Sequence, residues 1–445
     1  MIFDLTMVFN RKTLIYIIIP IAAILLVVVL WFGLNPPSLV SNKVVFWGTD
    51  DQKVFEDLLR GMAISYSNIK VEYVQKSPAT YEKDLLNAMA SGKGPDVFFI
   101  QNNWLPKYQN KISPLPSSLM PLKNYYDTFV DVATQDFVVD GNIWAVPLSV
   151  DTLALYYNKD FFNTVGIAEP PKDWNQFLDD VAQLTVKSDD GSLTRAGAAI
   201  GSSLNINSAT DILSLLMLQT GTKMTDETKT KATFNDSIFS NGQTSYPGEM
   251  ALSFYTNFTF PQLKQSTQNP SYTWNPKMEN SLESFCRGRT AMILDYSSAI
   301  SQIKSKAPYL NFGIASAPQT KDAQVAVNYA NYSGLTVWSG SKSPQAAWQT
   351  ILWLAQKEND QKYLAAVNQP TSRKDLIEWQ KNDPNLGTFA VHALSARSWY
   401  QADSEAIKEI FSQMIENVVY NKASVKDALE RAANQVTDLM QQNKN

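Results

Sequence analysis

From residue 43 onward the chain alternates short apolar runs with segments whose apolar residues recur at helical spacing. The runs "KVVFWG", "IKVEYVQ" and "PDVFFI" predict strands. Between them, "DDQKVFEDLLRGMAISY" and "TYEKDLLNAMASG" predict helices, and Asp50 or Asp51 is the expected N-cap of the first. Strands that alternate with helices favour a parallel α/β sheet. In such sheets ligands bind beyond the carboxyl ends of the strands, here at "WGTDD" and "QNNWLPKY".

A second series of elements follows residue 169. The segment "PPKDWNQFLDDVAQLT" predicts an amphipathic helix opened by Asp173, and "KSDDGSLTRAG" predicts a hairpin around Asp190-Gly191. "SATDILSLLMLQTG" reads as an apolar helix, and "GRTAMILDYSS" as a strand that runs into a polar loop. Two amphipathic helices close the chain, with apolar stripes that begin at Ile407 and Val425.

One carboxylate interrupts an otherwise apolar stretch. From Leu148 to Tyr157 the residues are nearly all apolar, which predicts a single buried strand, yet Asp151 lies inside it. A lone carboxylate in a buried strand is costly unless it is paired or hydrogen-bonded. We therefore expect Asp151 to have a specific partner.

The N-terminus carries an uncharged apolar run from Leu14 to Phe32, preceded by Arg11 and Lys12. Roughly 19 residues at about 1.5 Å each match the hydrocarbon thickness of a bilayer. The basic flank predicts that residues 1–13 are cytoplasmic, that 14–32 form an uncleaved transmembrane signal anchor, and that 33–42 form a linker to an extracytoplasmic domain. A cleavable signal peptide is the alternative, but "LWFGLNPPSLVSN" has no A-x-A-type cleavage site.

Composition, charge and the absence of certain motifs indicate which class of protein this is. The 445 residues are 44% apolar and 18% charged with a net charge of −4, which indicates a globular chain with two lobes and no nucleic-acid partner. A lone cysteine, Cys286, forms no intrachain disulfide, and a lone histidine, His392, excludes a histidine-rich metal site. We find no P-loop, dinucleotide or nucleophile-elbow motif, and expect no cofactor.

Several stretches, in this order and spacing, resemble the extracellular solute-binding proteins of ABC importers, in the carbohydrate-binding, maltose-binding-protein-like group. They are "GKGPDVFFIQNNWLPKY", "IWAVPLSVDTLALYYNKDFF", "PPKDWNQFLDDVAQLT", "GRTAMILDYSS" and "ASVKDALERAANQV". The resemblance implies a two-lobed periplasmic-binding-protein-like fold with a hinged cleft. Residues 43–149 and 334–390 would form lobe 1, and residues 150–333 and 391–445 would form lobe 2. It also implies a monomer that delivers a mono- or oligosaccharide to permease subunits and catalyses nothing.

The expected ligand-binding residues come from two sources, the ends of the predicted strands and the family resemblance. Strand ends supply Trp47, Thr49, Asn102, Asn103 and Trp104. The resemblance adds residues at positions where relatives have cleft residues: Asp151, Asp295, Tyr296 and Trp399. The chain departs from the family pattern at Ile100, Asn103, Tyr296 and Ser297, which leaves the identity of the sugar open.

Other interpretations remain open at this point. Each aromatic could be an ordinary packing residue, and Asp151 could instead cap a helix or pair with an arginine in the hinge. A glycoside hydrolase or lyase using two carboxylates, such as Asp151 and Asp295, is an alternative, as is a membrane-tethered adhesion protein. His392 and Cys286 are expected to be packing residues.

Overall fold

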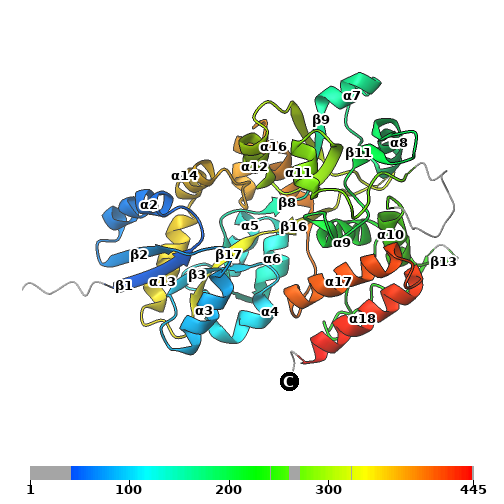
Figure 1. Cartoon of the computed structure of the whole chain (residues 1–445). Coiled ribbons are helices and arrows are strands. Elements are labelled where there is room, and N and C mark those ends of the chain that lie inside the picture. The colour runs from blue at the N-terminus through cyan, green and yellow to red at the C-terminus, as the bar shows by residue number, and fades with distance from the viewer. Residues whose placement is uncertain (1–41, 241, 260–270, 322, 443–445) are drawn as a thin grey trace, which may run out of the picture.

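Two α/β lobes lie side by side in the computed structural model, which describes residues 42–240, 242–259, 271–321 and 323–442 (Figure 1). The two-lobed expectation is therefore confirmed. The expected anchor at 14–32, the segment 1–13 and nearly all of the 33–42 linker lie outside the described residues. In the described ranges no helix has the length and apolarity needed to cross a membrane.

Lobe 1 is built on a mixed sheet. Its strand order is β2 (Ile69–Gln75), β1 (Asn42–Gly48), β3 (Val97–Gln101), β17 (Ser333–Trp338) and β4 (Ile112–Ser113), and β7 (Val146–Pro147) also pairs with β17. The strands β1, β2 and β3 are parallel, as the sequence pattern predicts. However, β17 is antiparallel to β3 and to β4, so a wholly parallel sheet was the wrong expectation. This strand returns from lobe 2 and enters the sheet from the opposite end.

The first two helices of lobe 1, which the sequence pattern predicts, begin and end close to their expected positions. The Asp51 carboxylate accepts a hydrogen bond from the backbone N–H of Lys53 and caps the first of them. The helices of this lobe are α2 (Gln52–Ser65), α3 (Tyr81–Ala90), α4 (Leu105–Tyr108), α5 (Leu122–Thr128), α6 (Asp131–Phe137), α13 (Pro344–Leu354), α14 (Lys357–Val367) and α15 (Ile377–Gln380).

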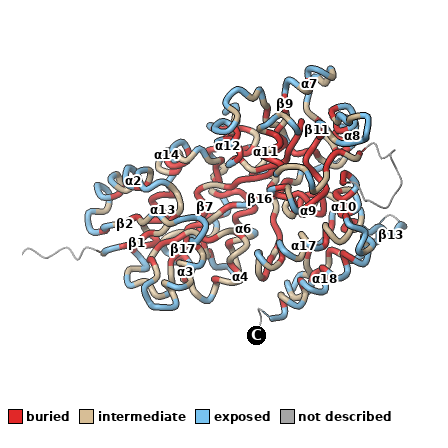
Figure 2. Tube along the Cα trace, in the orientation of Figure 1, coloured by how far each residue is buried: buried red, intermediate tan, exposed pale blue. Residues whose placement is uncertain are grey.

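Lobe 2 contains a second mixed sheet. Its order is β10 (Val186–Lys187), β11 (Leu193–Ala198), β14 (Thr290–Asp295), β9 (Ala154–Asn158) and β15 (Phe312–Ser316). The surrounding helices are α7 (Lys159–Val165), α8 (Trp174–Leu184), α9 (Ala209–Gln219), α10 (Pro247–Thr256), α11 (Ser281–Cys286), α12 (Ala299–Lys306), α16 (Gly387–His392), α17 (Ser404–Val419) and α18 (Val425–Gln442). Each lobe has its own buried interior (Figure 2).

A small three-stranded sheet joins the lobes where the chain crosses between them. It pairs β8 (Asp151–Thr152) and β18 (Ala396–Arg397) with the two sides of β16 (Asn328–Asn331). The single strand expected from Leu148 to Tyr157 is therefore wrong, because this stretch follows β7 and divides between two further sheets as β8 and β9. The polar residues Ser149 and Asp151 lie where the chain changes sheets: Ser149 bridges to Thr371, and Asp151 pairs with Asn331. The exact lobe boundaries stay a prediction.

Candidate functional site

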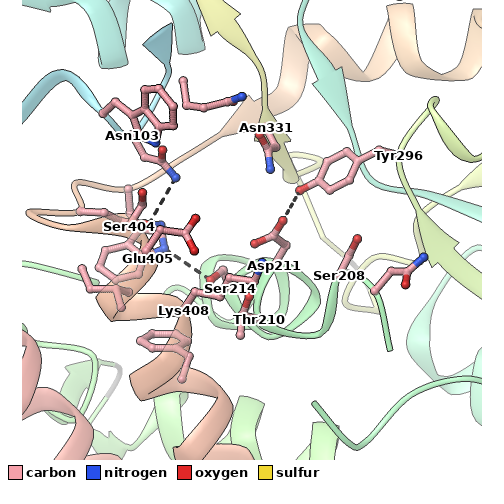
Figure 3. Close-up of a pocket in the computed structure, with 17 residues that line it drawn as sticks. Asn103, Ser208, Thr210, Asp211, Ser214, Tyr296, Asn331, Ser404, Glu405 and Lys408 are labelled. Atoms are coloured by element: carbon pink, nitrogen blue, oxygen red, sulfur yellow. Dashed lines mark hydrogen bonds between the residues drawn. The ribbon is translucent and has the colours of Figure 1, made fainter. Parts of the chain in front are cut away.

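A cavity of about 370 Å³ lies between the lobes, and we call it the α9 cavity (Figure 3). The loop after β3, the N-terminal half of α9, the loop after β14, the end of β16 and the first half of α17 all contribute to it. Its principal polar lining residues are Gln101, Asn103, Asn207, Ser208, Thr210, Asp211, Ser214, Tyr296, Asn331, Gln401, Ser404, Glu405 and Lys408. These side chains come from both lobes, so a ligand here would touch both.

Asp211 and Tyr296 form the polar centre of this cavity. The Tyr296 hydroxyl donates a 2.7 Å hydrogen bond to the Asp211 carboxylate, as Figure 3 shows. Burial raises the pKa of Asp211, and the Tyr296 hydroxyl and the Lys408 ammonium act in the opposite direction. The backbone carbonyl of Tyr296 in turn accepts a hydrogen bond from the Tyr156 hydroxyl at 2.7 Å. The tyrosine ring is thus held at both ends and presents a fixed surface.

Aromatic rings line the same cavity. Trp399 stacks on Phe411 with ring centroids 5.5 Å apart, and its indole N–H donates to the Ser214 hydroxyl at 3.4 Å. Trp104 stacks on Tyr108 with centroids 5.5 Å apart. Both tryptophans therefore have fixed orientations. Rings held in this way offer flat apolar faces beside the hydrogen-bonding groups.

A second cavity of about 580 Å³, which we call the β1 cavity, adjoins the first and shares Gln101, Trp104, Asn331 and Glu405 with it. It extends toward the carboxyl end of β1, where its lining includes Thr49, Asp50 and Asp151. The two cavities together follow the edge of the lobe 1 sheet at which the parallel strands end. This is the edge at which α/β sheets bind ligands.

Asp151 lies at the wall of the β1 cavity and is almost entirely buried. Its carboxylate accepts hydrogen bonds from the Ser297 hydroxyl at 2.7 Å, the Ser297 N–H at 3.0 Å and the Thr152 N–H at 2.8 Å. Burial raises its pKa to about 7, although these bonds pull the pKa down. The partner that the sequence required is therefore the loop after β14. The Ser297 N–H also lies 3.2 Å from the other carboxylate oxygen, so donors of the protein reach both oxygens of Asp151.

The other expected residues divide between the cavities and the interior. Asn103, Trp104, Tyr296 and Trp399 line the α9 cavity, and Thr49 lines the β1 cavity. Asp295 lines none of the cavities discussed here: its carboxylate accepts from Asn207 at 3.2 Å and from the Tyr296 N–H at 2.9 Å, and burial raises its pKa.

Trp47 and Asn102 also take other positions. The Trp47 ring lies under the Lys76 ammonium, 3.7 Å from the ring centroid, and lines none of these cavities. Asn102 is buried, donates to Asp136 at 2.9 Å, and lines a third cavity that is described below.

Sequence reasoning missed several residues of the cavity, above all Asp211, Glu405 and Lys408. A signal for Asp211 was present, because it is the one charged residue in the 11-residue helix α9, "ATDILSLLMLQ". The argument applied to Asp151 holds equally for a carboxylate in an apolar helix. Glu405 and Lys408 begin an amphipathic helix, where charged residues are ordinary, so nothing marked them.

The described parts of the chain provide little evidence for a metal site or for a reactive histidine or cysteine. Among those residues no cluster of three or more His, Cys, Asp or Glu side chains could hold a metal ion. His392 is tied between Asn328 at 2.7 Å and the Ser316 hydroxyl at 2.8 Å, and burial lowers its pKa to about 4. Burial raises the pKa of the Cys286 thiol, which disfavours the reactive thiolate.

Comparison with known proteins identifies relatives along most of the chain. The model of the family described as bacterial extracellular solute-binding protein matches residues 52–361. The galactooligosaccharide-binding protein of Bacillus subtilis is 22% identical over 375 residues, which cover 82% of this chain and 82% of that protein.

Solved structures give the same picture of the fold. The sugar-binding protein MalE from Xanthomonas citri superposes with a TM-score of 0.74 at 20% identity, covering 91% of this chain and 98% of that one. The cyclic alpha-maltosyl-1,6-maltose binding protein from Arthrobacter globiformis gives 0.74 at 18% identity, covering 90% and 99%. These structures share the two-lobed fold with this chain.

Proposed function

Because the chain belongs to the family of bacterial extracellular solute-binding proteins, we propose that it binds a carbohydrate between its lobes and delivers it to the permease of an ABC importer. The ligand is a mono- or oligosaccharide held in the α9 and β1 cavities. The protein releases it chemically unchanged.

The observation that carries this proposal is the composition of the α9 cavity. Sugars present rings of hydroxyls and apolar C–H faces, and they need planar polar groups beside flat aromatic surfaces. The cavity combines amides and carboxylates with fixed rings, notably Asn103, Asp211, Glu405, Tyr296 and Trp399. The binding of sugars by the relatives from Bacillus subtilis and Xanthomonas citri supports the same ligand class.

A glycoside hydrolase is not favoured. That chemistry needs two carboxylates that flank the scissile bond, with one free to donate a proton to the leaving oxygen. Of the pair considered, Asp295 is buried and already bonded to Asn207 and the Tyr296 N–H, and it lines none of the cavities described above. The relatives are described as binding proteins, and none of the three is described as an enzyme.

The ligand class is tested by a thermal-shift screen of mono- and oligosaccharides followed by isothermal titration. A ligand that binds only the folded state raises the melting midpoint by mass action. Asp211→Asn should then weaken the best ligand about tenfold or more, since it replaces a charged acceptor in the cavity. Glu409→Gln, on the exposed side of α17, is the matched control and should bind normally. A protein that no sugar stabilises, or that cleaves its oligosaccharide, would contradict the proposal.

The apolar run at 14–32 supports membrane anchoring, with the two lobes on the extracytoplasmic side. We predict that mass spectrometry of the mature protein from membranes recovers peptides from residues 1–13. The short, proline-containing linker would then keep the lobes close to the bilayer. A mature N-terminus near Ser38 or Val40 would show that the segment is cleaved.

A further inference from the structure

A third cavity, of about 480 Å³, adjoins the α9 cavity and has a different character. We call it the α4 cavity. Lobe 1 contributes α4 and the C-terminal part of α6, lobe 2 contributes the end of α9 and the loop from Lys223 to Lys229, and residues 398–401 line it as well. Asn103, Trp399 and Gln401 line both this cavity and the α9 cavity. Asn103 donates to Gln401 at 3.4 Å, so this pair stands between the two spaces.

The charges that line the α4 cavity are unbalanced. Lys223 and Lys229 are exposed, and neither forms an ion pair with a carboxylate of the described residues. The one acid in the lining, Asp136, is bonded to Asn102 at 2.9 Å, to the Tyr332 hydroxyl at 2.8 Å and to Ser398. It attracts Lys229 at longer range, but its oxygens are occupied by these donors. The cavity therefore offers two ammonium groups to an incoming anion.

The loop that carries Lys229 is held in an unusual conformation. Lys229 has a φ of +55°, in the left-handed region that non-glycine residues seldom adopt. The Asp226 carboxylate fixes the turn by accepting from the N–H groups of Thr230 at 2.7 Å and Lys231 at 2.8 Å. The Lys229 ammonium then lies 5.4 Å from the centroid of the Tyr400 ring, at the cavity. Strain of this kind persists only where surrounding bonds enforce it, and it gathers at functional sites.

The other residues that line the α4 cavity determine the size and polarity of the ligand that it can hold. Apolar side chains cover part of the wall, including Leu105, Val139, Leu218 and Met224, and Gln109 and Gln135 supply amides. A ligand the size of one sugar ring fits this combination of apolar and amide side chains, with its negative group toward the two lysines. Ammonium groups act as point charges toward carboxylate or phosphate and set no strict geometry.

We infer that the α4 cavity is a separate site for a small organic anion, a carboxylate or phosphate carried on a sugar-sized body and held by Lys223 and Lys229. The site adjoins the proposed sugar site and shares Asn103, Trp399 and Gln401 with it, but the two lysines line only the α4 cavity.

The test uses the full chain carrying Asp211→Asn, so that sugar binding in the α9 cavity is weakened. D-glucuronate and D-glucose 6-phosphate are titrated by calorimetry at low salt, with neutral D-glucose as the matched probe. At least one of the two anions should bind at least tenfold more tightly than glucose, and added salt should weaken that binding. Binding of neither anion, or equal binding of glucose, would overturn the inference. Failure of the sugar proposal would appear separately, in titrations of the unsubstituted protein with neutral sugars.

Variants locate the site. Lys223→Ala combined with Lys229→Gly should reduce anion affinity at least tenfold, and glycine accepts the left-handed backbone, so the loop keeps its shape. Lys229→Arg keeps the charge and should retain binding. Lys422→Ala is the control, because Lys422 also lies over a tyrosine, 5.6 Å from the Tyr420 ring centroid, but lines none of these cavities. Unchanged affinity in the double variant, or an equal loss in Lys422→Ala, would overturn the assignment.

Discussion

Asp151 connects the interlobe sheet to the loop after β14, and it also faces the β1 cavity. We predict that Asp151→Ala lowers the melting midpoint and weakens ligand binding by roughly ten- to a hundredfold, since a charge-assisted hydrogen bond contributes about 1.5–3 kcal/mol. Ser297→Ala is the comparison, because it removes one donor to the carboxylate and leaves the charge. Calorimetry and thermal melts measure both effects. Wild-type affinity together with a lower midpoint in Asp151→Ala would assign the residue to the hinge alone.

Asp360 in α14 is the most isolated acid among the described residues. It is 0% exposed, and neither carboxylate oxygen has a hydrogen-bond partner. Burial raises its pKa well above the ordinary 3.8, although Arg373 partly opposes this. Because the folded pKa exceeds the unfolded one, the stabilising contribution is complete below pH of about 4 and is lost as pH rises toward the folded pKa.

Asp360→Asn should therefore stabilise lobe 1 at neutral pH. The melting midpoint should therefore rise at pH 7, and the gain should disappear near pH 4, where the carboxyl group becomes protonated in the unfolded chain as well. Thermal melts across this pH range measure the difference. Asp127→Asn, an exposed acid on α5, should show no such trend. A gain that does not depend on pH would contradict the raised pKa of Asp360.

At the scale of elements, local signals predicted most of the secondary structure. Apolar spacing placed α2, α8, α17 and α18, and the cap residues Asp51 and Asp173 mark the starts of the first two. The hairpin of β10 and β11 also follows from its turn residues. Periodicity could not show that Leu148–Tyr157 divides between two sheets after β7, since β7, β8 and β9 each pair with a partner distant in sequence. The Asp211–Tyr296 contact depends on the same long-range packing.

Replacing either of two helical glycines by alanine should change the stability of the fold, but in opposite directions. A Cβ on Gly248 in α10 would collide with the backbone carbonyl of Phe234, which cannot move away as a side chain could. Gly248→Ala should therefore lower the melting midpoint of lobe 2 strongly. Gly61 in α2 meets only ordinary contact, 3.4 Å from the Trp353 ring, and Gly61→Ala should stabilise by up to about 1 kcal/mol through helix propensity. Calorimetric melts decide both. A tolerated Gly248→Ala would contradict the tight contact between α10 and the Phe234 segment.

For the whole molecule, the lobes contact one another through short crossing segments, and both line the same cavities. We predict closure about the strands near Val150 and Gly334 when ligand binds, because hinge closure surrounds a ligand with groups from both lobes. Small-angle scattering with the best sugar from the screen should give a smaller radius of gyration. The same curve with and without saturating ligand would contradict closure.

The repeated crossing of the chain also governs the order in which it can fold. Strand β3 has its second partner in β17, where Ser333 pairs with Gln101, so the sheet of lobe 1 stays incomplete until most of the polypeptide has been synthesised. Lobe 2 is completed later still, because its helix α18 packs on α10 and on α17 and ends only at Gln442. Such high contact order slows folding and leaves strand edges open in the nascent chain. Until β17 and α18 have been synthesised, the nascent chain can therefore complete neither lobe.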